Sequence, residues 1–438
     1  MANPLSAAAG AAAEPATLVL MLGVAGLLTA RARWPLGVAL AAAAAAGAVA
    51  NGHAFPLRHL VEGAFSYLDP ILVIATAMIF MRALADAGAL DTIGRSVESR
   101  FGDRPAVLLP LVMLIVMFPG MITGSSTASV LTAGAMATSV LGRLGLAPAR
   151  AAAFVGMGGI LGMIAPPINI PAMLIGSGID LPYAGFTAPL ALAAFPVALG
   201  VAYGLGRPLL SGRGAVLPER PAPQAEAALR PALPLWRALL PVAVAVVLML
   251  APALAPGRIP EPGLPLTFLL AAAAVVAVRP RFGVRVSALR AAEEALPVLG
   301  ILAGVGAFIQ VMTLTGARGW LVALMVGAPS WAIFAAAAVS LPLFGAVSAF
   351  GSASVLGVPF LLALLGRDEI VTTAGLSMLA GLGDLMLPAA LAPTLAARAA
   401  GLDDRRPVLR LCVLPALAVA GCAVVILFFA PQLGRWLR

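Results

Sequence analysis

The chain has 438 residues, of which 62% are hydrophobic and only 10% are charged, and its mean hydropathy is +1.05. This composition excludes a soluble globular domain and indicates a polytopic membrane protein. The formal net charge of +9 comes from arginine, since lysine is absent. These arginines stand between apolar runs rather than along one face, which argues against nucleic-acid binding and marks them as topology signals.

Apolar runs long enough to span the bilayer, about 30 Å of hydrocarbon, predict an all-α protein with about ten full crossings. They begin near residues 16, 35, 57, 150, 184, 234, 263, 288, 370 and 407. Two further apolar regions, 105–145 and 329–366, are interrupted in the middle by Gly and Ser. Because each is too short for two ordinary spans, we interpret both as re-entrant helical hairpins.

Arginine placement orients these segments, because short cytoplasmic loops carry an excess of arginine. The first hairpin is flanked on both sides by arginine-rich segments. These segments contain Arg95, Arg100, Arg104, Arg143 and Arg150. The second hairpin has only Arg318 and Arg367 beside it. We therefore expect the first hairpin to enter from the cytoplasm and the second from outside, and ten crossings place both termini outside.

The two halves of the chain share a sequence pattern. "TASVL" at 127–131 recurs as "SASVL" at 352–356, once in each hairpin. Downstream, the proline-broken "IAPPINIPAM" at 164–173 corresponds to "LPAALAPTLA" at 387–396. A span, a short amphipathic arm, a hairpin and a broken span thus occur twice with opposite entry. Inverted repeats of this kind are typical of secondary transporters that bind their substrate near the bilayer midplane.

The pattern divides the chain into six segments around these repeats. They are N-terminal scaffold helices at 1–54, a first repeat at 55–206 with a broken helix at 150–178, a cytoplasmic linker at 207–233, scaffold helices at 234–283, a second repeat at 284–400 with a broken helix at 370–400, and a C-terminal helix at 401–438. The linker is rich in Pro, Arg and Ala, a composition that suits a connector between two halves.

Three stretches of the first half resemble a known family. "ILVIATAMIFMRALADAGALDTIGRSVESRFGDRP" (71–105), "GSSTASVLTAGAM" (124–136) and "GMGGILGMIAPPINIPAMLIGSGIDLPYAGFTAPLAL" (156–192) are similar to the large membrane subunit of the TRAP (tripartite ATP-independent periplasmic) transporters of the ion transporter superfamily. The similarity extends more weakly through the second half. In the second broken helix, the acidic residue of the family pattern is displaced to Asp384 and the prolines of that pattern are separated. This part of the chain therefore departs from the family pattern.

The resemblance implies an elevator-type carrier that imports a small organic anion, such as a dicarboxylate, by sodium symport. It implies sodium as the coupling ion, with no other cofactor, and two protein partners: a periplasmic substrate-binding protein and a small four-helix membrane subunit. It also implies a multi-pass protein of the bacterial cell inner membrane, so that the two outer termini are periplasmic.

Backbone that leaves the helix at membrane depth must be buried in protein or line a cavity. Carbonyl and hydroxyl oxygens are hard donors that suit a small hard cation. We expect sodium at the backbone carbonyls near Ser125 and Asn169, and at a matching set near Ser352 and Asp384. The candidate ion- and substrate-binding residues are Gly124, Ser125, Ser126, Thr127, Ser129, Pro166, Pro167, Asn169, Ser352, Ser354, Asp384, Pro388 and Thr394. The positive N-terminal ends of the half-helices would favour a substrate carboxylate.

Other interpretations of these residues stay open. Gly and Ser also occur in membrane helices because they permit close packing. An intramembrane acid such as Asp384 is a functional candidate, with a paired structural acid as the alternative. A stand-alone carrier driven by protons through Asp384 is the nearest alternative function. A serine hydrolase using Ser126 or Ser352 is disfavoured, because His53 and His59 lie at a membrane edge and a nucleophilic serine needs a base. We expect no enzymatic activity.

Overall fold

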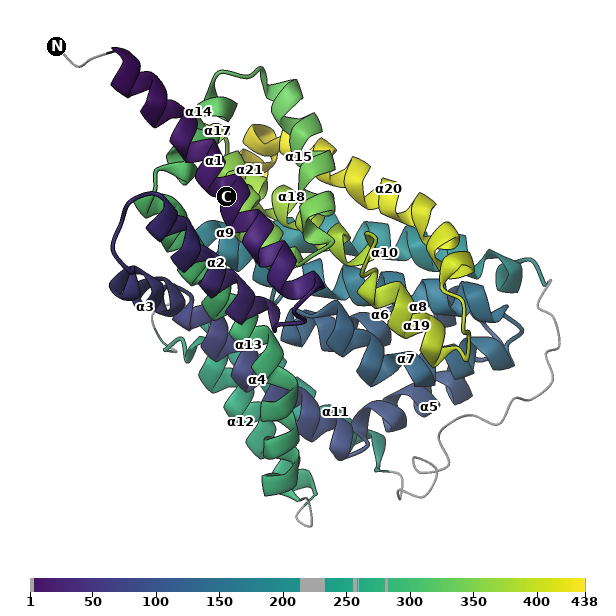
Figure 1. Ribbon diagram of the computed structural model, residues 1–438. Coiled ribbons are helices and arrows are strands. Elements are labelled where there is room, and N and C mark those ends of the chain that lie inside the picture. Colours follow the sequence, from purple (N-terminus) through teal and green to yellow (C-terminus); the bar gives the residue numbers. More distant parts are fainter. Residues whose placement is uncertain (1–3, 213–232, 255–257, 259, 280–282, 438) are drawn as a thin grey trace.

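The computed structural model describes residues 4–212, 233–254, 258, 260–279 and 283–437. Every regular element in these ranges is a helix (Figure 1), which confirms the all-α class. Six helices are long and apolar enough to cross a membrane by length and composition. They are α4 (Leu68–Asp86), α6 (Pro105–Thr123), α10 (Thr187–Leu210), α11 (Leu235–Leu254), α13 (Val284–Leu314) and α20 (Arg406–Phe428).

Shorter apolar helices occupy the other predicted spans. They are residues Glu14–Ala30 of α1 (Pro4–Ala30), α2 (Leu36–Ala50), α8 (Pro148–Ile164) and α12 (Gly263–Val278). The predicted crossing near residue 57 begins later than expected. Residues 57–66 form a separate amphipathic helix, α3 (Leu57–Ser66), and Tyr67 leaves the helical conformation with φ −104° and ψ 26° before α4 begins. On α3, Arg58 donates a 2.6 Å hydrogen bond to Glu62, which lowers the pKa of that exposed carboxyl.

Both re-entrant hairpins are present. In the first, α6 and α7 (Ser126–Arg143) meet at a turn where Gly124 has a left-handed φ of 62° and the Ser125 side chain accepts a hydrogen bond from the Ala128 amide. In the second, α15 (Ser330–Gly345) is followed by α16 (Ala349–Ser352), a π-helical segment η1 (Ala353–Gly357) and α17 (Val358–Ala363). Both tips thus have a serine N-cap, because the Ser348 side chain accepts from the Gly351 amide in the same way.

Each hairpin is followed by a helix that breaks at proline. The first pair is α8 and α9 (Ile170–Ser177), and the break holds the cis Pro166–Pro167 bond. The second pair is α18 (Glu369–Gly381) and α19 (Leu391–Ala399), separated by a short 3₁₀ segment, η2 (Leu382–Leu385), and the cis Leu387–Pro388 bond. Helix α8 ends where it does because proline removes an amide donor and disfavours helix in the preceding residue. Helix α18 ends at Gly381 and passes into η2 before Pro388 is reached.

The two halves pack reciprocally. Helix α9, the second part of the first broken helix, packs against α18 and the second hairpin, whereas α19 packs against α8 and α7 of the first hairpin. Figure 1 shows α19 beside α7 and α8 although it lies far from them in the sequence. Hairpins and breaks therefore form one body in which each half completes the other.

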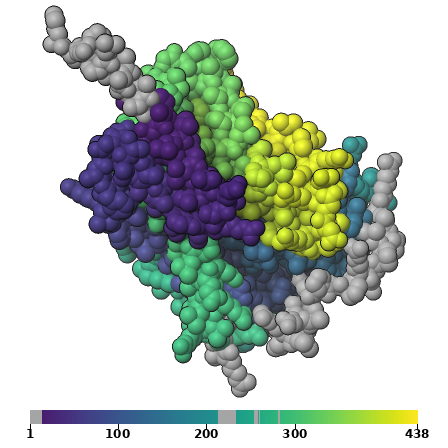
Figure 2. Space-filling view, in the orientation of Figure 1, coloured from purple at the N-terminus to yellow at the C-terminus, as the bar shows by residue number. Residues whose placement is uncertain are grey.

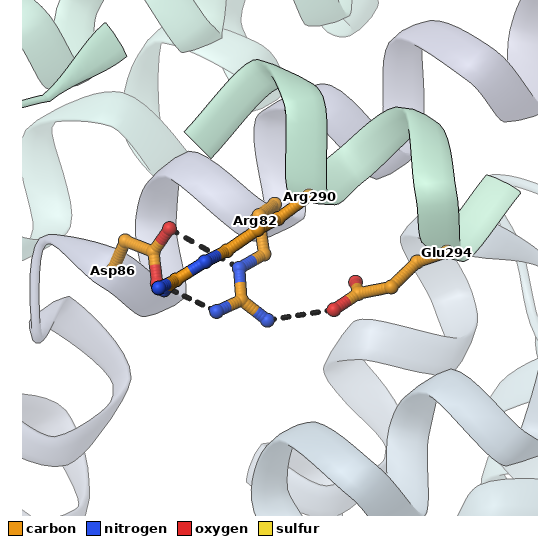
Figure 3. A network of polar contacts seen from close by, with 4 residues as sticks. All are labelled: Arg82, Asp86, Arg290 and Glu294. Carbon is orange, nitrogen blue, oxygen red and sulfur yellow. Dashed lines mark hydrogen bonds and ion pairs between the residues drawn. The ribbon is translucent and has the colours of Figure 1, made fainter. Parts of the chain in front are cut away.

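A second body surrounds the long helix α13. Helices α2, α3 and α4 pack on α13, and α12 packs on α4. The approach is close, since a Cβ on Gly63 would lie 2.5 Å from the Gly306 carbonyl oxygen. At one end of α4, Arg82 binds Asp86 at 2.9 Å and Glu294 of α13 at 2.7 Å, and Arg290 lies 3.9 Å from Asp86 (Figure 3).

Two amphipathic arms join these bodies. Helix α5 (Ala89–Phe101) follows α4 after Gly88, which has a φ of 75°, and α14 (Ala317–Val326) follows α13 after Gly316, which has a φ of 78°. In Figure 2 the N-terminal helices and the C-terminal helices cover opposite sides of the visible face. Most of the predicted linker, 213–232, lies outside the described residues, and α10 continues to Leu210. The six segment boundaries stay predictions.

Candidate ion and substrate site

The first hairpin tip faces the first break. A Cβ on Gly124 would lie 2.5 Å from the Ile170 side chain at the start of α9, so only glycine permits this approach. The Ile168 amide donates a 3.2 Å hydrogen bond to the Met121 carbonyl near the end of α6. The tip and the break are thus hydrogen-bonded to each other through the backbone as well as packed together. Thr127, on the same tip, is half-buried.

Asn169 organises the first break. Its side chain is fully buried and donates at 2.9 Å to both the Ile164 carbonyl and the Ser377 hydroxyl of α18. Its side-chain oxygen accepts from the Ala172 amide at 2.9 Å. One amide group therefore caps α9, satisfies the last carbonyl of α8 and ties both to the second repeat.

Tyr183 completes this arrangement from the loop after α9. Its hydroxyl accepts from the Asn169 amide at 2.9 Å and donates to the Pro167 carbonyl at 3.1 Å. Tyr183 and Ser377 were not identified from the sequence. Tyr183 is one of only three tyrosines in the chain, and it lies shortly after a proline-broken span. This position is the one local sequence signal that could have identified Tyr183.

Several carbonyl oxygens at this junction have no hydrogen-bond donor among the described residues. Within the described residues, the carbonyls of Gly124, Ala165 and Pro166 accept no hydrogen bond. Gly124 and Pro166 are buried. Because buried backbone carbonyls are seldom left without a partner, these oxygens are available to a cation.

Two of the predicted serines hold their own hairpins together. The Ser129 hydroxyl donates to the Val116 carbonyl of α6, and the Ser352 hydroxyl donates to the Leu341 carbonyl of α15 at 2.6 Å. Ser129 and Ser352 are therefore structural equivalents. The matched letters "TASVL" and "SASVL" instead align Ser129 with Ser354, two residues away. Ser354 is buried in the π-helical segment η1.

Asp384 joins the two halves. It lies half-buried in η2 at the second break, and its carboxylate accepts a hydrogen bond from the Ser126 hydroxyl at the tip of the first hairpin. The predicted first and second site residues thus meet across the repeat boundary rather than forming two separate groups.

The remaining predicted residues, Pro388 and Thr394, contact an arginine that the sequence suggested only as a topology signal. Arg405 donates to the Pro388 carbonyl at 3.1 Å, to the Ala389 carbonyl at 3.1 Å and to the Thr394 hydroxyl at 3.0 Å. The Thr394 hydroxyl itself donates to the Ala390 carbonyl at 2.7 Å. The second break is therefore bound by a guanidinium group that reaches back from the start of α20.

The sequence matches the family described as the DctM component of tripartite ATP-independent periplasmic transporters over residues 22–433. The chain belongs to this family. The crystal structure of the Alcanivorax borkumensis YdaH transporter is similar in fold, with a TM-score of 0.67 over 92% of this chain and 98% of that one. At 16% identity, that likeness shows the fold alone. No curated protein matches the sequence.

Membership confirms the resemblance noted in the first half of the sequence. This DctM chain is the large component of a tripartite transport system and a multi-pass membrane transporter. Membership in a transporter family explains why hydroxyl groups and broken helices lie inside the apolar core. The site of a soluble enzyme would instead lie in a water-filled cleft.

Proposed function

We propose that this DctM chain couples the inward movement of sodium to the uptake of a small organic anion of the carboxylate type. The observation that carries the proposal is the junction of the first hairpin tip and the first break. There, the Gly124, Ala165 and Pro166 carbonyls accept no hydrogen bond within the described part of the chain, beside the fully buried Asn169. Neutral carbonyl oxygens without a donor suit a small hard cation, and backbone of this kind is tolerated within a membrane only where it is buried or lines a cavity.

The substrate binds next to this ion. Helices α7 and α9 both begin at the junction, and their N-terminal amides and positive dipole ends favour a carboxylate. A bound sodium ion adds positive charge at the same place, so that ion and anion stabilise one another. This mutual stabilisation is the physical basis of symport, because neither binds well alone.

Access alternates by an elevator movement. The hairpins and breaks pack together as one body, and the helices around α13 form the other. The connecting arms α5 and α14 each follow a glycine of positive φ, Gly88 and Gly316, which permits a sharp change of direction between scaffold and arm. The first body would slide against the second while the arms pivot.

A periplasmic substrate-binding protein and a small four-helix membrane subunit are the partners. Support for them comes from the family, whose description is that of a tripartite system. Both termini of this chain face the periplasm in the topology that the arginine distribution favours.

Sodium binding is measurable before the substrate is known. We expect the purified protein to melt at a higher temperature in NaCl than in choline chloride of equal ionic strength and pH, because a ligand that binds only the folded state stabilises it. The increase should disappear in Asn169→Ala, whereas Arg82→Gln, which lies in the scaffold, should keep it. Identical melting in both salts would refute sodium coupling.

A second candidate is proton coupling through Asp384. It is favoured by one observation, the half-buried carboxylate that accepts a hydrogen bond from Ser126. In that case uptake into proteoliposomes would follow an imposed pH gradient without sodium, and Asp384→Asn would abolish it. Uptake of radiolabelled succinate, malate and fumarate, with the substrate-binding protein supplied outside, compares the two gradients directly.

A further inference from the structure

Arg318 stands alone in a long apolar part of the chain. It is the only charged residue between Glu294 and Arg367, and it lies at the start of the arm α14. One guanidinium nitrogen donates at 2.8 Å to the Gly178 carbonyl at the end of α9. Among the described residues this is its one hydrogen bond, although a guanidinium group carries several donors. A lone charge among apolar residues of a membrane protein is a candidate for a binding site.

The Arg318 side chain lines a groove of about 710 Å³ between the arm α14 and α17, the return helix of the second hairpin. Figure 1 shows these two helices side by side. The volume is that of a typical ligand site, about 300–1,000 Å³. Apart from Arg318 and Thr313, the lining residues carry hydrocarbon side chains or none. They include Gly319, Val322, Ala323, Val326 and Leu362.

Small residues on one face of α14 leave this groove open. Gly316, Gly319 and Ala323 are three and four residues apart, so they lie on the same side of the helix. A Cβ on Gly319 would meet nothing within 4 Å. The ten residues of α14 extend for about 15 Å, from Arg318 near its start to Val326 at its end. The groove thus has a cationic group toward one end and apolar walls beyond it.

Aromatic residues indicate the level of α14 in the membrane. Trp320 lies within α14 and is half-buried, and Trp331, shortly after the helix, is 73% exposed. Tryptophan is enriched where the hydrocarbon of a bilayer meets the headgroups. Leu324 and Val326 of the same helix are exposed as well. We therefore expect the groove to open toward lipid, with the Arg318 guanidinium at the height of the headgroups.

Two acids come near the groove, but neither pairs with Arg318. Glu14 of α1 lies against the turn before α14, since a Cβ on Gly316 would be 3.0 Å from its carboxylate oxygen. Asp180 is exposed and follows Gly178 by two residues. Over the part of the chain that the structure describes, neither carboxylate lies within 4.0 Å of the Arg318 guanidinium nitrogens, and neither lines the groove. The guanidinium therefore keeps donors for an anion from outside the chain.

We propose that the groove between α14 and α17 binds one anionic phospholipid, with its phosphate at Arg318 and an acyl chain along Gly319, Ala323 and Leu362. A planar guanidinium suits two oxygens of a phosphate group. One basic side chain near the headgroups favours an anionic lipid over a zwitterionic one by about 5-fold. A lipid in this groove contacts the arm and the second hairpin together, beside the turn at Gly316.

The test is native mass spectrometry of the purified full-length protein with palmitoyl-oleoyl phosphatidylglycerol or with phosphatidylcholine of the same acyl chains. We expect the wild type to retain phosphatidylglycerol about 5-fold better. Arg318→Gln can still donate to the Gly178 carbonyl but carries no charge, so it should retain one phosphatidylglycerol fewer per chain. Arg318→Lys, which keeps the charge, should retain the wild-type number.

Gly319→Leu tests the groove itself. It keeps Arg318, and its side chain fills the space that is open above Gly319, so it should also lose one phosphatidylglycerol. Arg435→Gln is the matched control. Arg435 is an exposed arginine that likewise donates to one backbone carbonyl, that of Pro431, at 3.2 Å. This variant should retain as much phosphatidylglycerol as the wild type.

Equal retention of the two lipids by the wild type, or an unchanged number of bound phosphatidylglycerol molecules in Arg318→Gln or Gly319→Leu, would overturn the proposal. An equal loss in Arg435→Gln would do the same, because any exposed arginine would then have this effect. If an excess of inorganic phosphate displaces the lipid, the groove binds free anions and the lipid assignment is wrong. If Arg318→Gln does not fold, Gly319→Leu decides. The measurement needs neither sodium nor substrate, so its outcome is separate from that of the proposed sodium coupling.

Discussion

Replacing Gly162 with alanine separates the first hairpin from its broken helix. The new Cβ would lie 2.9 Å from the Cα of Met117 and closer still to the Met117 carbonyl oxygen. Carbon atoms prefer a separation of about 3.5–4.0 Å, so α6 and α8 must move apart by about 0.6–1 Å. Neither obstacle is a flexible side chain, because both atoms belong to the backbone.

The magnitude follows from that movement. A gap of about 0.5–1 Å forfeits a quarter to a half of each van der Waals contact along the interface, and overpacking of a close-packed interior costs about 1–3 kcal/mol. Alanine has a higher helix propensity than glycine, and this offsets at most about 1 kcal/mol of the lost stability. We therefore expect a net loss of about 1–2 kcal/mol and a Tm lower by on the order of 3 °C.

Sodium affinity should fall as well. The Gly124 carbonyl belongs to the hairpin, whereas the Ala165 and Pro166 carbonyls belong to the break, so the same movement widens the proposed ion site. We expect the sodium concentration needed for half of the thermal stabilisation to increase at least about 10-fold, as coordination distances tolerate only a few tenths of an ångström.

Gly204→Ala is the matched control. Gly204 lies within α10, and a Cβ there would meet nothing within 4 Å, so the substitution should leave Tm unchanged or slightly higher. Melting curves of both variants in NaCl and in choline chloride give stability and sodium affinity together. If Gly162→Ala behaves like Gly204→Ala in both respects, the close packing of hairpin against break is refuted.

Two further predictions concern the buried amide and the scaffold ion pairs. Asn169→Ala removes the group that binds Ile164 and Ser377, so we expect a loss of about 2–4 kcal/mol and of the sodium-dependent rise in Tm. Asn169→Ser, which retains a hydroxyl cap for α9, should recover part of the stability. Arg82→Gln breaks the contacts with Asp86 and Glu294. Because Glu294 is 50% exposed, we expect only about 1 kcal/mol of destabilisation and normal sodium affinity; a large change in affinity would contradict the separation of scaffold and site.

Much of the architecture follows from the sequence because its signals are local. The first turn needs a residue that tolerates positive φ, and Gly124 stands there, followed by Ser125 as the N-cap of α7. The consecutive prolines at 166 and 167 interrupt an apolar helix, whereas single prolines such as Pro297 in α13 lie within continuous helices. Hairpins, breaks and the all-α class were therefore predictable from neighbouring residues together with the apolar run lengths.

The residue-by-residue correspondence between the two repeats could not be predicted from the matching sequence alone. The matched letters at 127–131 and 352–356 align Ser129 with Ser354. In the structure, however, Ser129 and Ser352 are the pair that hold their hairpins together. The turns differ in length, and the caps decide which residue begins the return arm. The identification of α3 as a separate helix likewise depended on the bend at Tyr67, which lies between the amphipathic α3 and the apolar α4.

Composition, arginine placement and proline positions by themselves determined the class of this protein and where its backbone must leave the helix. Only the tertiary structure decided which side chains satisfy the freed backbone. Tyr183 reaches Asn169 across 14 residues, Ser377 reaches it across 208, and Arg405 reaches Pro388 across 17. Such partners have no fixed spacing, since they are brought together by helix packing rather than by helical or strand periodicity. The contact between Arg405 and the second break therefore became visible only in the folded chain.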